Sequence, residues 1–415
     1  MPMKKLFQLY TNTNLIVRIA ICLVIGVVLG LAVPSATAIG ILGNLFVGSL
    51  KAIAPVLVFV LVISSIANSK GSVGKRFRTV IALYIISTLL AAITAVVASY
   101  LFPVTITLAS AAEGTAPDSL AQVLTNLLNN IVANPIASIS NANYLGILFW
   151  AVVIGLAVKL VASQTTKEVF GNISESITKV VHWVIQFAPF GILGLVFTLV
   201  SENGIDIFKD YGKLLAVLVG CMLVVAFVVD PIIVAVCLKK NPYPLVIRCF
   251  RESGVTAFFT RSSAANIPVN MELCRKLNLD KNLYSVSIPL GATINMDGAA
   301  ITITIMTLAA ANTLGIQVSL PMAIILSFMA TLGACGASGV AGGSLLLIPM
   351  ACSLFGISND IAMQVVGIGF IIGVVQDSLE TAINSSGDVI FAATAEYMER
   401  QKNGEKIEFK KEFKE

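Results

Sequence analysis

Polar residues in a C-terminal apolar segment recur at the spacing of a helix. The segment is QDSLETAINSSGD, residues 376–388, and four of its polar side chains follow one another at intervals of four, three and four residues: Asp377, Thr381, Asn384 and Asp388. On a helix these intervals place the side chains on one narrow stripe, with Glu380 just beside it. Carboxylate, amide and hydroxyl oxygens are the ligands that hard cations prefer. The stripe therefore predicts a site for a positively charged ligand.

A second acid interrupts another apolar segment, TINMDGAAIT (residues 293–302). Between Leu283 and Gln376 the charged residues are Asp297 and Asp360 alone. An ionised side chain inside such a segment is costly unless it is paired or faces a polar cavity. Arg261 is the one basic residue at comparable depth in this half of the chain, so the acids need cations from elsewhere. A proton, a sodium ion and a substrate ammonium group all remain open at this point.

The composition predicts that these sites lie within a membrane. Of 415 residues, 57% are hydrophobic and 12% are charged, and the mean hydropathy is +0.92. Soluble chains carry about twice that charged fraction. Apolar runs near the ~20 residues that cross a bilayer recur along the chain. The first six expected spans are 15–33, 40–66, 78–102, 144–163, 178–200 and 211–237. We therefore expect an all-α polytopic membrane protein whose first span is a retained helix.

The basic residues fall on alternate connections between these spans. They lie before the first span, at 69–78, at 159–167 and at 239–251, whereas residues 103–143 contain no Lys or Arg. Cytoplasmic loops are enriched in Lys and Arg. This pattern predicts a cytoplasmic N-terminus, and the charged tail of residues 397–415 is expected on the same side.

Two segments in the C-terminal half do not have the composition of a single transmembrane helix. Residues 244–276 are too polar to cross lipid, and their two ends are both basic; residues 321–356 are apolar but contain the glycine-rich GACGASGVAGGS (333–344). Each is predicted to enter and return on the same side as a helical hairpin. The full spans between them, 284–313 and 361–396, carry polar interruptions at INMDG and INSSGD. This arrangement is typical of transporters whose broken helices meet a substrate near the midplane.

Four motifs together carry a resemblance to a known family: TRSSAANIPV, PLGATINMDG, GASGVAGGS and NSSGD. In order and spacing, over essentially the whole chain, the sequence resembles the dicarboxylate/amino acid:cation symporter family, and most closely its sodium-coupled serine and threonine transporters. The resemblance implies the glutamate-transporter-homologue fold, with eight transmembrane helices plus two re-entrant helical hairpins, assembled as a homotrimer. It also implies three parts. They are residues 1–243 (spans 1, 2, 4 and 5 as scaffold, with spans 3 and 6 moving with the core), a transport core of residues 244–396, and the cytoplasmic tail of residues 397–415.

The resemblance also implies site residues. One sodium site would use Asp388 with main-chain oxygens of Gly291, Asn295 and Asn384. A second would use main-chain oxygens of Thr293, Ala334, Cys335 and Ala337. A third would use Asp297 and Asn295 with Tyr84, Ser87 and Thr88. The substrate would contact residues at the two hairpin tips and on the last span: Ser262, Ser263, Val340, Ser344, Asp377, Glu380, Thr381 and Asn384.

The chain departs from the acidic-substrate members at two positions. Glu380 stands where they carry an Arg that binds the second substrate carboxylate, and Ala299 stands where they carry a Thr. We therefore expect import of serine and threonine by sodium symport across a bacterial inner membrane. The alternatives are sodium- or proton-coupled symport of another neutral amino acid or a dicarboxylate, and, in a different class, a gated ion channel. Enzymatic activity is not indicated, because no nucleophile–base arrangement is recognisable. The sequence does not indicate an organic cofactor or a nucleic-acid partner either.

Overall fold

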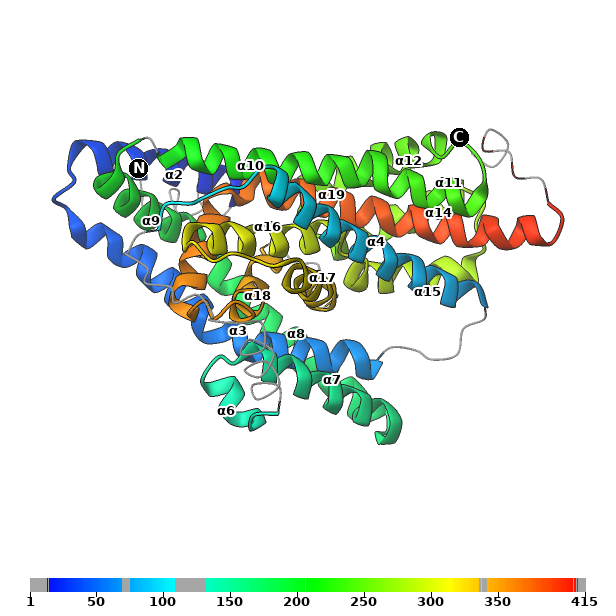
Figure 1. Ribbon diagram of the computed structural model, residues 1–415. Coiled ribbons are helices and arrows are strands. Elements are labelled where there is room, and N and C mark those ends of the chain that lie inside the picture. Colours follow the sequence, from blue (N-terminus) through cyan, green and yellow to red (C-terminus); the bar gives the residue numbers. More distant parts are fainter. Residues whose placement is uncertain are drawn as a thin grey trace, which may run out of the picture.

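The computed structural model describes residue 13 and residues 15–68, 75–108, 132–205, 207–335, 337, 342–405, 407 and 409, and all its regular elements in this part of the chain are helices (Figure 1). The first half contains α2 (Leu15–Ala32), η1 (Thr37–Ile39), α3 (Gly40–Asn68), α4 (Lys75–Leu101), α6 (Pro135–Ser140), α7 (Tyr144–Val161), α8 (Gln164–Gln186), α9 (Ala188–Asn203), α10 (Ile207–Val224), the π-helical turn η2 (Val225–Val229) and α11 (Asp230–Leu238). The second half contains α12 (Tyr243–Cys249), the π-helical turn η3 (Phe250–Gly254), α13 (Val255–Thr260), α14 (Ser263–Lys276), α15 (Lys281–Ile294), α16 (Asp297–Thr313), α17 (Leu320–Ala334), η4 (Ser344–Leu347), α18 (Ile348–Ser353) and α19 (Asn359–Lys402).

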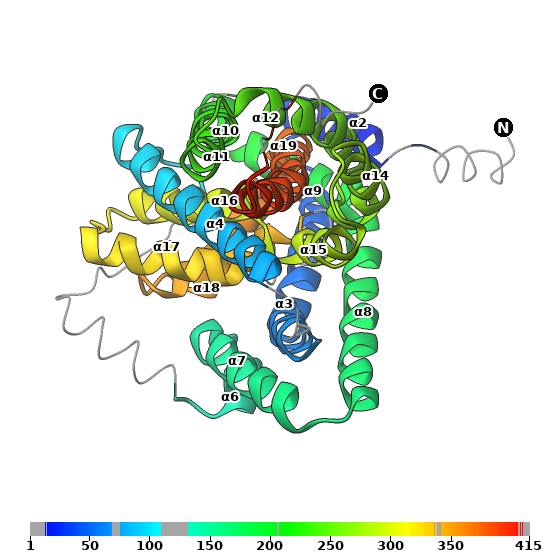
Figure 2. The ribbon, with the colours of Figure 1, turned by 90° about the vertical axis from the view of Figure 1, so that its right-hand side faces the viewer.

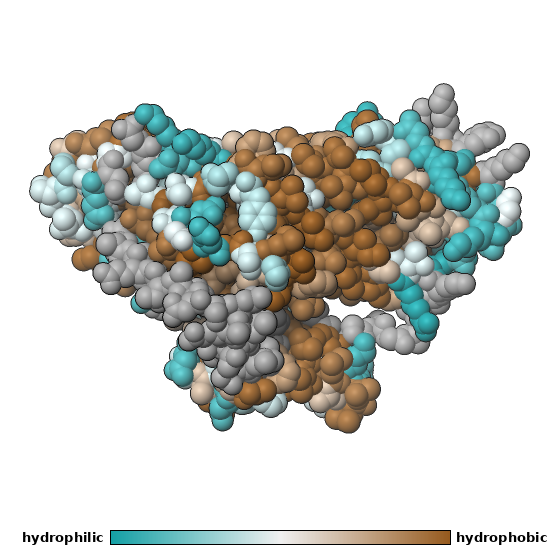
Figure 3. Space-filling model, in the orientation of Figure 1, coloured by the Kyte–Doolittle hydropathy of each residue, from teal (hydrophilic) through white to brown (hydrophobic). Residues whose placement is uncertain are grey.

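The lengths and hydropathy of these helices suit a membrane. Among the described residues, five helices are long and apolar enough to cross one, and α8 with α9 forms a sixth candidate bent by 52°. Figure 3 shows a broad hydrophobic zone in the middle of one face, with hydrophilic residues gathered at both ends. The span expected over 178–200 falls on this bent pair, and the bend lies at Phe187, just before Pro189. A proline at the first positions of a helix lacks the N–H that would continue the preceding one.

The helices pack in two groups. α2 packs against α9, and α3 packs against α7, α8 and α9. The second group surrounds α19, which contacts α4, α10, α11, α13, α14, α15, α16 and α18, and which also touches α3 and α9 of the first group. Figure 2 shows α19 near the centre of this group, with α7 and α8 lying apart from it. The polar stripe on α19 is therefore enclosed by protein and not by lipid.

Several chain junctions meet at one end of the molecule, on the right in Figure 1. Arg76 at the start of α4 forms an ion pair with Asp280, which precedes α15, at 3.2 Å. The Gln401 side chain near the end of α19 donates to the Leu238 carbonyl at the end of α11, at 3.2 Å. These contacts place the ends of α4, α11, α15 and α19 together.

The segment over 244–276 is a hairpin, as predicted. Its first arm is α12, η3 and α13; its second arm is α14, and the turn lies at Arg261, whose φ is +51°. Lys276 at the end of the second arm pairs with Glu252 in the first arm at 3.1 Å, so the arms run antiparallel. The segment therefore starts and finishes at the same end of the molecule.

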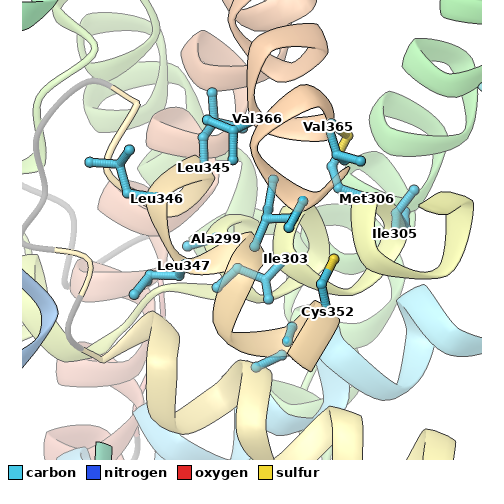
Figure 4. Close-up of a cluster of buried hydrophobic side chains, with 14 of the residues drawn as sticks. Ala299, Ile303, Ile305, Met306, Leu345, Leu346, Leu347, Cys352, Val365 and Val366 are labelled. Atoms are coloured by element: carbon cyan, nitrogen blue, oxygen red, sulfur yellow. The ribbon is translucent and has the colours of Figure 1, made fainter. Parts of the chain in front are cut away.

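The segment over 321–356 also reverses. α17 ends at Ala334 and η4 begins at Ser344, and a Cβ added at Gly333 in α17 would contact Met350 on α18. Residues of the returning arm insert their side chains among those of α16 and α19, including Leu345, Leu346 and Cys352 (Figure 4). This packing fixes the arm against the two helices that carry the acidic residues.

The chain breaks its helix at one of the two polar interruptions, 294–298, and continues as a helix through the other, 383–388. At 294–298 the helix breaks between α15 and α16, where Asn295 and Met296 leave the helical conformation. At 383–388 no break exists, and α19 runs unbroken for 44 residues, so the prediction of a second broken helix is wrong. The hydroxyl of Ser386 bonds within the helix to the Ala382 carbonyl at 2.8 Å. Gly387 instead permits a close approach, since a Cβ there would lie 2.7 Å from the Asn295 amide nitrogen.

Candidate functional site

The break between α15 and α16 places Asp297 against α4. One carboxylate oxygen, Oδ1, accepts hydrogen bonds from the hydroxyls of Ser87 at 3.0 Å and Thr88 at 2.8 Å. Ser87 also donates to the side-chain oxygen of Asn295 at 3.2 Å. These four residues are completely buried. The structure therefore brings together all five residues that were predicted for the third sodium site. Tyr84 takes part through its carbonyl oxygen, which lies within hydrogen-bond distance of the Ser87 and Thr88 hydroxyls one turn later.

The other oxygen of Asp297, Oδ2, is buried and has no hydrogen-bond partner among the described residues. Leaving a buried carboxylate oxygen unpaired is costly. A hard cation at this position would satisfy it, and the surrounding hydroxyl, amide and carbonyl oxygens are suitable ligands. The donor set at Asp297 therefore fits a sodium ion.

Asp388 forms a neighbouring cluster. Its Oδ1 accepts from the amide nitrogen of Asn295 at 3.2 Å, and the same amide donates to the Asn384 carbonyl at 3.0 Å. The hydroxyl of Tyr84 donates to the Asp388 carbonyl at 2.9 Å. Gly291 lies so close that an added Cβ would be 2.6 Å from Asp388 Oδ1. Asn295 thus joins the Asp297 and Asp388 clusters.

The residues predicted for the second sodium site lie near the ends of α15 and α17. The thiol of Cys335 donates to the Ile294 carbonyl at 3.4 Å, which brings the two helix ends together. Ala334 and Ala337 are buried there, and the Thr293 hydroxyl donates to the Leu290 carbonyl of its own helix at 2.7 Å. The last carbonyls of a helix have no partner within it. A main-chain oxygen site at this junction stays a prediction.

Three helical turns before Asp388 on α19, Asp377 is paired with protein groups. Its Oδ2 lies 2.6 Å from Nε of Arg261 at the first hairpin tip, and its Oδ1 accepts from the Gly342 N–H at 3.0 Å. Ser262 caps α14, where its hydroxyl accepts from the Ala265 N–H at 3.2 Å, and Ser263 is buried at the first position of that helix. Both hairpins therefore reach Asp377. Val340 lies outside the described residues.

Glu380 is held by neutral donors. Its Oε2 accepts from the hydroxyls of Thr302 at 2.8 Å and Ser344 at 2.9 Å, and from the Gln376 amide at 2.5 Å. Thr302 and Gln376 were missed by the sequence reasoning. Gln376 could have been found, since it precedes Glu380 by one helical turn; Thr302 sits in an apolar run that gives no such signal.

Two further predicted substrate residues, Thr381 and Asn384, form hydrogen bonds with main-chain groups. Thr381 donates to the Asp377 carbonyl of its own helix at 2.7 Å. Asn384 accepts from the Gly298 N–H at 2.8 Å through its side-chain oxygen. The Asn384 carbonyl belongs to the Asp388 cluster, as described above, so this residue lies between the two halves of the stripe.

A second group that the sequence reasoning missed joins the first hairpin to α19. The amide of Asn266 donates to the Ser385 hydroxyl at 2.7 Å, and that of Asn270 donates to the Ser385 carbonyl at 3.0 Å. The hydroxyl of Ser253, from the other arm, donates to Asn270 at 2.5 Å. Asn270 also lies 3.5 Å from Asp388 Oδ2. The first hairpin is thereby connected to the Asp388 cluster.

The fold and these clusters define a multi-pass membrane transporter with buried, oxygen-rich sites around one central helix. The sodium:dicarboxylate symporter family matches residues 15–398, and the chain belongs to that family, whose members are transporters and not enzymes. The resemblance drawn from the four motifs is thereby confirmed.

Relatives match over nearly the full length. The chain is 60% identical over 401 residues to the serine/threonine transporter SstT of Bifidobacterium adolescentis, covering 96% of this chain and 93% of the relative. It is 59% identical to the serine/threonine transporter SstT of Streptococcus agalactiae and 55% identical to that of Streptococcus thermophilus, each over 396 residues, covering 95% of this chain and 98% of each relative.

Proposed function

We propose that this protein imports serine and threonine by sodium symport. The observation that carries the proposal is the pair of acids on α19. Asp377 already engages Arg261, and Glu380 is surrounded by neutral hydroxyl and amide donors. No base among these contacts is left for a second substrate carboxylate. The names of the relatives agree with a neutral hydroxy amino acid as substrate.

The clusters suggest how the substrate is held. Its ammonium group would pair with Asp377, and its carboxylate would accept from N–H groups at the start of α14, where the helix dipole favours an anion. A short hydroxyl would reach Glu380 or Thr381. A site built to bond a hydroxyl discriminates against a substrate that leaves its polar groups unpaired. Serine and threonine are therefore expected to be preferred over alanine.

Sodium coupling is supported by the Asp297 and Asp388 clusters, which share Asn295. The resemblance and the packing of the helices in two groups support an elevator-like mechanism. In this mechanism α4, α10, α11 and the elements of residues 244–396 move against α2, α3, α7, α8 and α9. A homotrimer, with both termini in the cytoplasm of a bacterial inner membrane, completes the proposal.

Uptake into proteoliposomes tests the proposed function. We expect serine and threonine uptake to follow an inward sodium gradient and to be unaffected by equimolar aspartate. Two like charges at ~4 Å repel by about 4 kcal/mol at an effective dielectric near 20. Even half of that repulsion between Glu380 and a second substrate carboxylate would disfavour aspartate more than about tenfold. Block of serine uptake by equimolar aspartate would contradict the substrate assignment. Uptake that ignores sodium and follows a proton gradient would contradict the ion assignment.

The matched variants are Glu380→Arg and Glu380→Gln. The arginine variant replaces the acid with a base and is expected to lower serine uptake and to relieve the discrimination against aspartate. The glutamine variant keeps the size and the hydrogen-bond acceptor, so it should lose less serine uptake than the arginine variant.

A further inference from the structure

One more buried acid lies on a helix to which no sodium or substrate contact has been assigned. Asp230 is the first residue of α11 and is 1% exposed. It follows the π-helical turn η2 and precedes Pro231, which has no N–H to continue a regular helix. Such π-helical turns within α-helices occur frequently at functional sites. One carboxylate oxygen of Asp230, Oδ1, is buried and has no hydrogen-bond partner among the described residues.

Asp230 lies beside the Asp297 cluster. The π-helical turn η2 packs against α4, the helix that carries Ser87 and Thr88. Ile233 and Val234, one turn along α11 from Asp230, belong to the same buried cluster as Tyr84. Asp230, at the end of η2, and Asp297 therefore both lie beside α4.

Each of these acids has one buried carboxylate oxygen without a hydrogen-bond partner among the described residues. Asp297 uses Oδ1 for Ser87 and Thr88, and its Oδ2 is unpaired; Asp230 has its own unpaired Oδ1. The ion pairs found among the described residues involve neither acid. Two buried carboxylates without a counter-charge are strongly unfavourable, whereas a cation between them would satisfy both free oxygens.

We infer that Asp230 supplies a second carboxylate oxygen to a cation held at Asp297, so that α11 takes part in sodium binding. The inference rests on the proposed sodium coupling and adds a ligand to it. The site would then combine two carboxylates with the oxygens of Ser87, Thr88 and Asn295. A small hard cation suits such an all-oxygen set, and sodium is the one that the family's coupling supplies.

Sodium titrations of the purified full-length protein in detergent test this inference. Sodium chloride replaces choline chloride at constant ionic strength, and two signals are followed: the rise in unfolding temperature without amino acid, and the binding of radiolabelled serine. We expect Asp230→Asn to raise the sodium concentration for half-saturation in both signals by roughly tenfold or more. Raising the sodium concentration further should restore serine binding, because the loss is one of sodium affinity.

Glu396→Gln is the matched control. Glu396 is also a buried acid, but it lies on α19 and accepts from the Asp280 N–H, away from the Asp297 and Asp388 clusters. Its sodium half-saturation should equal that of the wild type. If Asp297→Asn shifts the half-saturation and Asp230→Asn does not, this inference is overturned and sodium coupling stands. If the wild type itself does not respond to sodium, both the Asp230 inference and the proposed sodium coupling are overturned. Should Asp230→Asn aggregate, Asp230→Ala replaces it, and an unchanged half-saturation in that variant, which has no carboxylate, overturns the inference.

Discussion

Arg261 and Asp377 form a buried ion pair, with Nε of the guanidinium 2.6 Å from Oδ2 of the carboxylate. The side chains are 11% and 3% exposed, so water screens the pair little. Arg261 reaches this position from the hairpin turn, where its backbone is left-handed. The arginine occupies the partner position that we assign to the substrate ammonium group. Substrate binding must therefore share Asp377 with Arg261 or displace it.

Arg261→Gln is expected to destabilise the substrate-free protein. Removing one partner of a buried ion pair leaves the other charge uncompensated, at a cost of about 3–5 kcal/mol. Serine should then stabilise the variant more than it stabilises the wild type, because its ammonium group replaces the lost cation. Thermal unfolding in detergent with and without serine measures both effects. An equal serine-induced shift in the two proteins would show that the ammonium does not bind at Asp377.

Asp388→Asn should weaken the sodium dependence of uptake far more than Asp377→Asn does. Asp388 shares Asn295 with Asp297 in the oxygen-rich clusters, whereas Asp377 contacts a guanidinium and a backbone N–H. The Asp377 variant should instead lose serine affinity at every sodium concentration. Uptake measured over a grid of sodium and serine concentrations separates the two effects. The same sodium half-saturation in both variants would disprove this division of roles.

Gly291→Ala should abolish sodium-dependent uptake. The new Cβ would lie 2.6 Å from Asp388 Oδ1 and 2.9 Å from the Tyr84 hydroxyl, so the cluster must distort. Gly220→Ala on α10 is the control, because nothing lies within 4 Å of a Cβ at that position. Uptake and sodium-induced thermal stabilisation are measured for both variants. Normal sodium stabilisation of the Gly291 variant would mean that Asp388 is not a sodium ligand.

The hairpin over 244–276 should begin and end in the cytoplasm. Its two ends lie at the same end of the molecule, and basic residues flank both. In a cysteine-free background, Lys240→Cys and Lys281→Cys should resist an impermeant thiol reagent in intact cells and react in opened membranes. Glu202→Cys, at the other end of the molecule near the start of α10, should react in intact cells. Labelling of one lysine position without the other would show that the segment spans the membrane.

Local sequence signals were sufficient for much of the architecture. Long apolar runs predicted most of the spanning helices, and the polarity of 244–276 predicted a hairpin. The break at 294–298 was predicted because an acid, an amide and a glycine interrupt one apolar run. The same reasoning failed at 383–388, where α19 continues. A buried polar helix face needs no break when neighbouring helices supply its partners.

The sequence by itself determined that the polar residues of 376–388 share one helix face, because their spacing sets that face. Only the tertiary structure decided which of them are partners. Arg261 could have paired with Glu380, but the hairpin turn directs it to Asp377, and Glu380 takes Thr302, which is 78 residues away. Asp230 sits on a helix that the motifs never marked. Packing between distant helices fixes these pairings, because a buried polar group takes whatever partner the fold brings within hydrogen-bond reach.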